Sequence, residues 1–401
     1  MAHASHERIW PESPARIATE HQSKRGSMKV EVNTTSLADA VAWTTRVIDA
    51  RPASPILAGI KLEAIDGTLQ LSAFNFEISA RDHIEAGIDE SGSTVVQGKI
   101  LADITRSLPS EKTYLSTENS TLIITSGKSK FTMQLMPESE YPDLPVVPPI
   151  LGKVDGETFH QAVDQACVAV SREETRPVLT GVFMQFKGDK VVMTSTDRFR
   201  LSRATFTWSP ENPDVSTNTL LRGSLLRDIA KTLNESQNVT INFSQDNPSL
   251  IGFENAGRVS TSQLIDGEFP AIDRLFADEY PIQAVIDKQQ LINSIKRVSL
   301  VAERNAPIRM AFSGSELTLS AGVADENQAS DVLDVDFDGD DITVAFNPSY
   351  LIEGLSAITE PFVRMKMTTA VKPVEFNGQQ EQDSDESMDY RYLLVPMRFS
   401  N

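Results

Sequence analysis

Three polar residues of the sequence are of the types that form a hydrolytic triad: Ser195, Asp197 and His160. A serine hydroxyl becomes a nucleophile when a histidine takes its proton and a carboxylate orients that histidine. Ser195 and Asp197 belong to "STDR", where the alternating pattern predicts a strand and no histidine is near. His160 lies near a predicted helix start. Strand-end hydroxyls are therefore the better interpretation, and a hydrolase remains an alternative.

Other signatures of catalysis do not occur in the sequence. It contains no GxxxxGK[ST], GxGxxG or HExxH pattern and no pair of cysteines for zinc. Outside residues 1–27 the histidines are His83 and His160, which we interpret as surface or hydrogen-bonded side chains. Cys167 lies on an apolar helix face, which predicts a buried structural thiol. We expect a protein that is not an enzyme and that holds neither a metal nor a cofactor.

The elements that would position any site are repeated along the chain. "PILAGI" (55–60) matches "PVLTGV" (177–182), and "LADITRSL" (101–108) matches "LRDIAKTL" (226–233). Apolar residues with one-face helical spacing also recur three times, as Leu37, Val41 and Ile48, then Phe159, Val163 and Val170, then Leu291, Ile295 and Ala302. Internal repetition of this kind predicts three similar units, each with a helix and strands twice over.

We therefore predict an α+β fold of three similar domains, each built from two helix-plus-strands modules. The predicted boundaries are 28–148, 149–277 and 278–401, preceded by a disordered extension over residues 1–27. Proline-containing linkers are expected at 145–153 and 275–281. The segment 379–389 carries five carboxylates and no base, which predicts a solvated hairpin loop between the last two strands.

Composition limits the location of the protein and its partners. No apolar run approaches the roughly 20 residues of a membrane span, and no apolar signal-peptide centre begins the chain, so we expect a cytoplasmic protein without membrane contact. The net charge of -19 should repel nucleic acid as a whole. Basic residues nevertheless recur on the predicted helices, and Arg227 and Lys231 share one helix face. From the residues alone, an ordinary solvated helix face is the better interpretation of these basic residues.

Several motifs, in order, resemble the bacterial DNA polymerase III beta subunit family, the replicative sliding clamps. They are "ARPASPILAGI" (50–60), "TRPVLTGV" (175–182), "STDRFRL" (195–201), "LIDGEFPAIDRL" (264–275) and "YRYLLVPMRF" (390–399). The resemblance covers residues 28–401. It implies a clamp fold in which two three-domain chains close head to tail into a ring around duplex DNA, with helices inside and sheets outside. Such a ring tethers the replicative polymerase and is not itself catalytic.

The resemblance also implies three sets of site residues. Sequence-independent contact with double-stranded DNA is expected from Arg51, Lys99, Arg106, Arg172, Arg176, Arg222, Arg227, Lys296 and Arg297. A pocket for short linear motifs of the polymerase catalytic subunit, the clamp loader and repair proteins is expected from Leu179, Thr196, Arg200, Leu201, Pro270, Arg274, Leu275, Leu393, Val395, Pro396, Met397 and Arg398. Arg198 and Phe199 depart from the glycine and histidine common in the family, which makes the motif preference an open question.

The third set is a homodimer interface, in which the strand edge 126–134 meets 313–322 of a second copy. Its expected residues are Lys128, Lys130, Phe131, Met133, Leu300, Val301, Asp325 and Glu326. Besides a clamp and a hydrolase, a repeat scaffold that binds peptides but never DNA remains an alternative. Retention on circular DNA discriminates between a clamp that encircles DNA and a repeat scaffold that never binds it.

Overall fold

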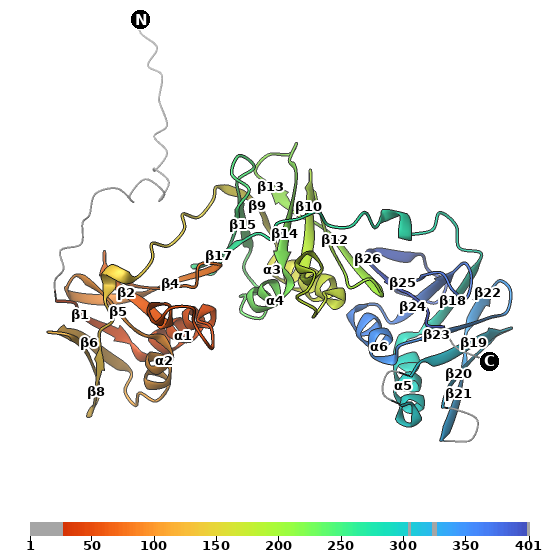
Figure 1. The fold of residues 1–401 in the computed structure, drawn as a ribbon, viewed down its shortest axis with the longest axis horizontal. Helices are drawn as coiled ribbons and strands as arrows, with labels where there is room; N and C mark the ends of the chain where they lie inside the picture. Colours follow the sequence, from red (N-terminus) through yellow and green to blue (C-terminus); the bar gives the residue numbers. More distant parts are fainter. Residues whose placement is uncertain (1–26, 304–305, 323–326, 399–401) are drawn as a thin grey trace, which may run out of the picture. The chain divides into compact units, whose positions relative to one another are not determined.

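The computed structural model describes residues 27–303, 306–322 and 327–398 (Figure 1). The predicted extension over residues 1–27 falls, except for Ser27, outside the described residues. The chain forms two compact units, Met1–Leu144 and Pro145–Asn401. Each is described here by itself.

One structural module, strand–helix–strand–strand–strand, occurs six times along the chain. The first unit contains two modules: β1 (Lys29–Asn33), α1 (Thr34–Thr44), β2 (Gly59–Ile65), β3 (Thr68–Phe74) and β4 (Ile78–Glu90), then β5 (Gly92–Gln97), α2 (Gly98–Arg106), β6 (Lys112–Glu118), β7 (Thr121–Ser126) and β8 (Ser129–Gln134). These two modules are the first domain. The predicted order of helix and strands is confirmed, and the structure adds one strand before every helix.

The second unit contains the other four modules. The middle domain consists of β9 (Ile150–Val154), α3 (Gly156–Ala166), β10 (Gly181–Lys187), β11 (Lys190–Thr196) and β12 (Arg200–Thr207), then, after the short β13 (Ser209–Pro210), β14 (Ser216–Arg222), α4 (Gly223–Ala230), β15 (Val239–Phe243), β16 (Leu250–Asn255) and β17 (Arg258–Gln263). The third domain consists of β18 (Ile282–Asp287), α5 (Lys288–Val298), β19 (Ile308–Ser313), β20 (Glu316–Gly322) and β21 (Gln328–Asp334), then, after β22 (Asp336–Asp338), β23 (Ile342–Phe346), α6 (Pro348–Ala357), β24 (Phe362–Met367), β25 (Val374–Gln379) and β26 (Glu386–Leu394).

Local sequence explains where the helices start. The side chain that precedes α1, α3, α5 or α6 accepts a hydrogen bond from a backbone N–H of the first turn, which satisfies a donor that the helix itself leaves open. These caps are Asn33, Asp155, Asp287 and Asn347, in that order. Among the described residues, the α2 and α4 starts have no such side-chain cap. Packing on the strands therefore carries more of the stability of these two helices.

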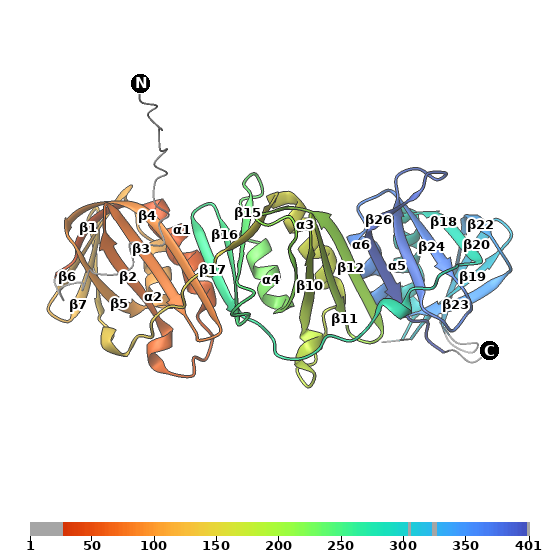
Figure 2. The same cartoon turned by 90° about the horizontal axis from the view of Figure 1, so that it is seen from above.

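The predicted apolar helix faces form the cores. Leu37 and Val41 of α1, Phe159 and Val163 of α3, and Leu291 and Ile295 of α5 are fully buried. The two helices of each domain pack against each other, α1 on α2, α3 on α4 and α5 on α6. The strands of each domain lie over its helix pair (Figure 2). The amphipathic spacing read from the sequence is thus the spacing that builds each core.

The sheets join neighbouring modules. In the first unit the strand order is β5-β2-β3-β4-β1-β6-β7-β8. In the second unit a nine-stranded sheet runs β14-β10-β11-β12-β26-β25-β24-β18-β22, so it crosses from the middle to the third domain at the β12–β26 pair. The acidic segment 379–389 contains a turn between β25 and β26, as predicted, but this turn is limited to residues 380–385, because Gln379 pairs in β25 and residues 386–389 pair or extend in β26.

Gly354 in α6 is a site where this packing leaves no room. A Cβ atom at this position would lie 2.1 Å from the ring of Tyr392 on β26. Tyr392 is fully buried, and its hydroxyl donates to the Tyr350 carbonyl at 2.8 Å. The ring therefore cannot move aside without breaking the contact between α6 and the sheet.

We expect Gly354→Ala to destabilise the second unit by about 1–3 kcal/mol, although alanine is ordinarily the better helix former. The exposed Ser356→Ala in the same helix is the control and should change stability by less than about 0.5 kcal/mol. Urea unfolding of both variants measures the difference. Equal midpoints for the two variants would show that the α6–Tyr392 contact is not tight.

Candidate functional site

The β12–β26 pair forms a seam between the middle and third domains. The two strands are antiparallel, with Arg200 opposite Leu394 and Leu201 opposite Leu393. Beyond the paired residues, the Val395 N–H donates to the Phe199 carbonyl at 2.9 Å and the Met397 N–H donates to the Ala345 carbonyl at 2.7 Å. The segment after β26 is therefore held by backbone bonds to both domains.

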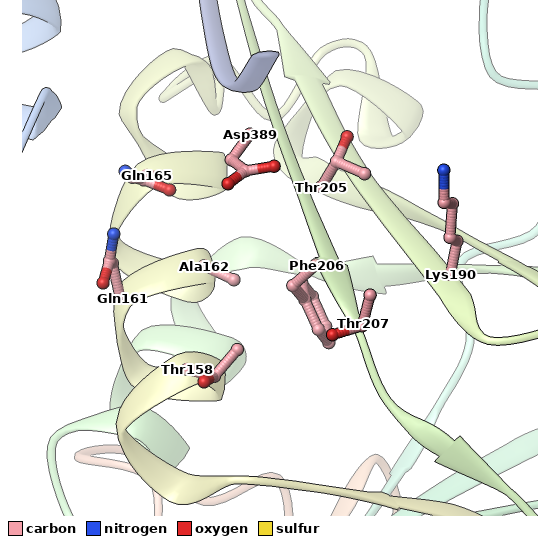
Figure 3. A pocket seen from close by; sticks show the side chains of 9 residues that line it. All are labelled: Thr158, Gln161, Ala162, Gln165, Lys190, Thr205, Phe206, Thr207 and Asp389. Carbon is pink, nitrogen blue, oxygen red and sulfur yellow. The ribbon is translucent and has the colours of Figure 1, made fainter. Parts of the chain in front are cut away.

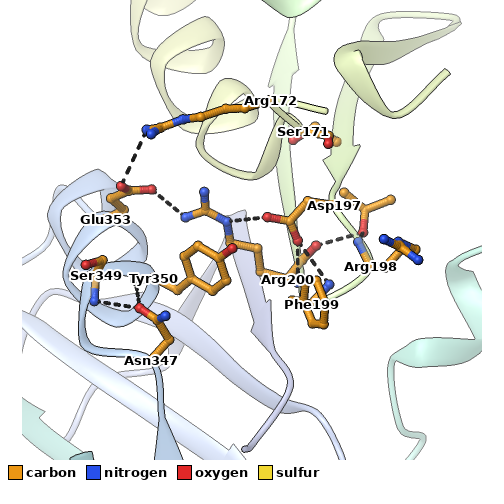
Figure 4. Close-up of polar contacts among 12 residues, drawn as sticks. Ser171, Arg172, Asp197, Arg198, Phe199, Arg200, Asn347, Ser349, Tyr350 and Glu353 are labelled. Atoms are coloured by element: carbon orange, nitrogen blue, oxygen red, sulfur yellow. Dashed lines mark hydrogen bonds and ion pairs between the residues drawn. The ribbon is translucent and has the colours of Figure 1, made fainter. Parts of the chain in front are cut away.

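Arg200 connects the two domains with its side chain (Figure 4). Its guanidinium donates to Asp197 at 3.0 Å and to Glu353 of α6 at 2.5 Å. It also lies 4.1 Å from the centre of the Tyr350 ring. Burial lowers the pKa of Arg200, but the nearby Tyr392 hydroxyl and the Glu353 and Asp197 carboxylates outweigh it, so the pKa is raised. Arg200 is a permanent, paired cation at 5 % exposure.

A pocket of about 350 Å³ opens beside this cation. Its walls come from the loop after α3, the turn before β12 and the start of α6: Val170, Ser171, Arg172, Glu173, Asp197, Arg198, Phe199, Arg200, Asn347, Ser349, Tyr350 and Glu353. Three arginines, three carboxylates and the rings of Phe199 and Tyr350 are among these residues. The pocket therefore offers ion pairs and ring contacts to a ligand.

The predicted pocket residues differ in how far they are exposed. Leu179, Thr196, Arg200, Leu201 and Leu393 are buried, and Pro396 and Met397 are half-buried. Pro270, Arg274, Leu275, Val395 and Arg398 are exposed. Leu201 and Leu393 pack with Ile272, and Phe269 and Phe276 cover them. The structure thus places an apolar cluster at the seam.

Of the twelve predicted pocket residues, Arg200 is the one that lines this pocket, and the predicted set missed the residues that α6 contributes. Asn347, Tyr350 and Glu353 belong to the cap and first turns of α6. Arg172, which was predicted to contact DNA, also lines the pocket, 4.0 Å from Glu353. The signal in the sequence was weak, because α6 carries an acidic residue where the matching helix of the middle domain carries a base.

The hydrolase hypothesis is wrong, because the three residues have other partners. The Ser195 hydroxyl donates to the Ala166 carbonyl at 2.5 Å. The Asp197 carboxylate accepts from two backbone N–H groups and from Arg200, and His160 lies 2.9 Å from Glu235. Cys167 is buried as predicted, and that burial raises the pKa of its thiol to about 12.

The predicted DNA-contact residues lie on helices α2, α4 and α5, at the end of β14 and on the loops after α1 and α3. Arg51, Lys99, Arg106, Arg172, Arg176, Lys296 and Arg297 are exposed, whereas Arg222 and Arg227 are half-buried. Some of their charge is engaged: Arg227 donates to the Cys167 carbonyl, and Arg297 pairs with Asp331. The exposed members offer cations to an anionic ligand, and the half-buried ones also hold local structure.

Two expectations about the dimer interface are corrected. Met133 is 6 % exposed and packs in the first core, because its strand alternates and places this residue inward. Strand β20 pairs with both β19 and β21, so the edge strands of this four-stranded sheet are β21 and β23 and not the predicted segment 313–322. Lys128 and Lys130 are exposed, Phe131 and Val301 are half-buried, and Leu300 is 85 % exposed. Asp325 and Glu326 lie outside the described residues.

A second pocket, of about 320 Å³, lies between α3 and β12 (Figure 3). Amides and hydroxyls line it, from Gln161, Gln165 and Thr205 among others, and it has one cation, Lys190, and one carboxylate, Asp389.

The described residues contain no group of three or more His, Cys, Asp or Glu side chains placed to hold a metal ion. None of the helices within the described ranges has the length and apolar character needed to cross a membrane.

A fully buried carboxylate stabilises the seam from its other face. Glu375 accepts hydrogen bonds from Tyr280 at 2.6 Å and from Arg391 at 2.6 Å, and Lys366 lies 3.3 Å away. Phe276 of the linker lies over Arg391, 3.8 Å from its guanidinium carbon. Burial raises the pKa of Glu375, but the bonds from Arg391 and Tyr280 and the charge of Lys366 outweigh it, so the pKa is lowered.

A lowered folded-state pKa stabilises the protein above the unfolded value of about 4.5 and loses that contribution as the pH falls from there through the folded value. We expect unfolding midpoints of the second unit to fall in this acidic window. Glu375→Gln should lower stability at pH 7, because it leaves buried cations unpaired, and should flatten the acid dependence. An identical acid dependence in the variant would assign the effect to other carboxylates.

Comparisons with known proteins follow the same division. Family models for the DNA polymerase III beta subunit match its N-terminal domain at residues 28–145, its central domain at 153–271 and its C-terminal domain at 273–398. The Streptomyces coelicolor beta sliding clamp is 43% identical over 375 residues, 93% of this chain and 100% of the relative. A beta sliding clamp homolog from Streptomyces muensis, GriR, is 33% identical over 93% of this chain and 100% of its own length.

Among solved structures, the DNA polymerase sliding clamp of Bacillus subtilis has the same fold, with a TM-score of 0.87. It is 24% identical and covers 94% of this chain and 100% of its own. The three consecutive domain matches and the full-length relatives lead to one conclusion. The chain belongs to the DNA polymerase III beta subunit family, the bacterial sliding clamps.

Proposed function

We propose that the chain is a DNA sliding clamp that encircles duplex DNA and tethers the replicative polymerase, without catalysis of its own. The observation that carries the proposal is the sixfold repeat of one module with basic residues on α2, α4 and α5. A closed ring around a helical duplex requires similar pieces at regular intervals, and a repeated module supplies them. The proposed domain boundaries are 28–148, 149–277 and 278–401, and the proposed place of action is the cytoplasm.

The charge pattern suits sliding. Contacts with phosphates alone give attraction that is sequence-independent and weakens with salt. A ring retains DNA by its topology, so these contacts need not be strong. The net charge of -19 leaves the protein as a whole repelled by DNA, so attraction comes from the exposed bases on the helices and the loops beside them.

Ring closure requires a second copy of the chain, and we propose a head-to-tail homodimer. The exposed Leu300 supplies an apolar contact, with Phe131 on the opposing domain, and β8 and β21 supply strand edges that pair across the interface. Lys128 and Lys130 add positive charge to the first edge, and β21 carries Asp331 and Asp334. One such contact between different surfaces closes when two copies make a cycle.

Protein loaded by a matching clamp loader should stay on nicked circular DNA and leave it after linearisation by a restriction enzyme. Gel filtration of the labelled protein with each DNA form measures retention. Leu300→Asp, which places a charge in the proposed interface without disturbing a core, should abolish retention on the circle. Lys296→Gln should preserve the difference in retention between circular and linear DNA, and it should lower the amount of protein loaded at elevated salt.

Equal retention on circular and linear DNA would contradict the ring. Retention on neither form, combined with intact peptide binding, would instead favour a scaffold that binds peptides but never DNA.

We propose further that the seam is the site where short linear motifs of the polymerase, the clamp loader and repair proteins bind. Exposed Val395 and Leu275 and half-buried Met397 offer aliphatic side chains. The Val395 N–H bonds to the carbonyl of Phe199 in the pocket wall, and the Leu275 N–H bonds to the carbonyl of Ile272 in the apolar cluster of the seam. Met adapts to side chains of different shape, which suits a site shared by several partners. Short peptides commonly bind such clefts with a few apolar anchors and a polar rim.

Deletion of residues 395–401 should abolish binding of a clamp-binding peptide and the processivity that the protein confers on its polymerase. The deletion removes the backbone bonds of Val395 and Met397, but β26 ends at Leu394 and keeps its pairing with β12, so thermal unfolding and dimerisation should change little. Fluorescence anisotropy of a labelled peptide measures the loss. Undiminished affinity in the truncated protein would place the partner site elsewhere.

A further inference from the structure

The turn between β11 and β12 is held in an unusual backbone conformation at the mouth of the pocket. Arg198 has a φ of 82°, a left-handed value that residues with a side chain rarely adopt. The Asp197 carboxylate accepts from the N–H groups of Phe199 and Arg200 at 3.0 Å each, and the Thr196 hydroxyl accepts from Arg198 N–H at 3.2 Å. These bonds fix the turn and make the left-handed residue tolerable.

This backbone places the Arg198 side chain at the pocket wall. Its guanidinium is 3.7 Å from the Glu173 carboxylate and 5.8 Å from the centre of the Phe199 ring. The Arg198 side chain is 47% exposed and that of Glu173 68%. Phe199, at 54% exposure, is a large apolar surface beside the cation. Arg198, Glu173 and Phe199 all line the pocket.

The cations of the pocket differ in how firmly their partners hold them. Arg200 is buried and bound by two carboxylates, Asp197 and Glu353, so it cannot exchange partners without opening the seam. Arg172 lies 4.0 Å from Glu353, which is already engaged by Arg200. Among the described residues, Arg198 has one carboxylate partner, the exposed Glu173, at a distance too long for a hydrogen bond. An incoming group can replace the exposed pairs of Arg172 and Arg198 at small cost. Of these two cations, Arg198 is the one that lies beside the exposed ring of Phe199.

We propose that Arg198 is a specificity-determining residue that favours peptides with an acidic side chain next to their apolar anchor, and that Glu173 is the internal carboxylate which this side chain displaces. The inference rests on the proposed peptide site at the seam. The aromatic surface of Phe199 accepts the anchor while Arg198 pairs with the neighbouring carboxylate, so one turn reads both features. Charge of this kind adds discrimination among partners more than total affinity.

The test uses pairs of capped synthetic nonapeptides that carry Leu and Phe anchors and differ at one flanking position, Glu in one and Gln in the other. Each flanking position is tried in turn, and dissociation constants come from fluorescence anisotropy with the full-length protein at low salt. At one position the Glu peptide should bind about threefold more tightly than the Gln peptide, as expected for one exposed ion pair. The preference should shrink at high salt.

Variants separate the charge from the turn and from the internal competitor. Arg198→Gln and Arg198→Gly should both abolish the Glu preference and leave affinity for the Gln peptide nearly unchanged. Glu173→Gln should increase the Glu preference, and the double variant with Arg198→Gln should lose it again. Lys187→Gln, an equal change of charge at the exposed end of β10, is the control and should keep the wild-type ratio.

A Glu-to-Gln ratio of one at every flanking position in the wild-type protein would overturn the inference and leave the proposed peptide site standing. A Glu preference that survives in Arg198→Gln would also overturn it. If neither peptide binds, and deletion of Val395–Asn401 leaves the anisotropy of the labelled peptides as in the wild-type protein, the proposed site and this inference are both overturned.

Discussion

The backbone pairing of β12 with β26 is the interaction on which the candidate site depends. It joins a strand of the middle domain to the last strand of the chain and makes one sheet of two domains. Strand pairing of this kind fixes register, so it also fixes which side chains face each other across the seam. Arg200 then reaches Glu353 and Tyr350, and Val395 reaches the Phe199 carbonyl. Without the pairing, the pocket walls would belong to separate bodies.

The turn at the candidate site recurs in the first domain, although the pocket around it is formed by other elements. The turn at 74–78 in the first domain has the same hydrogen bonds as the turn at 196–200: the Asn75 side chain accepts from the N–H groups of Glu77 and Ile78. Phe76 has a φ of 74°, matching Arg198 at 82°. The module therefore reproduces the backbone device. In the second unit, α6 supplies further pocket walls and Val395 bonds to Phe199 of the turn. The candidate site therefore depends on the neighbours of a repeated turn.

Local physical chemistry made much of the fold predictable. The spacing of Leu37 with Val41 and of Phe159 with Val163 identified buried helix faces. The acidic turn 380–385 was recognisable as part of a loop because it holds no base, although the strands on either side extend further than predicted. Features that depend on distant pairing were not predictable. The sequence 313–322 alternates like an edge strand, yet β21 covers it, and Met133 resembles an interface residue until its strand orientation is known. The polar residues of α6 at the pocket were missed for the same reason.

The proposed peptide site lies where the middle and third domains are joined, and amide hydrogen exchange with the full-length protein tests this most directly. Exchange is compared with and without a saturating peptide carrying Leu and Phe anchors. We expect slower exchange for Val395 and Met397, for the turn 197–200 and for the start of α6, with no change in the related turn 74–78. Slower exchange at 74–78, or unchanged exchange at Val395 and Met397 with the peptide bound, would contradict the proposed site.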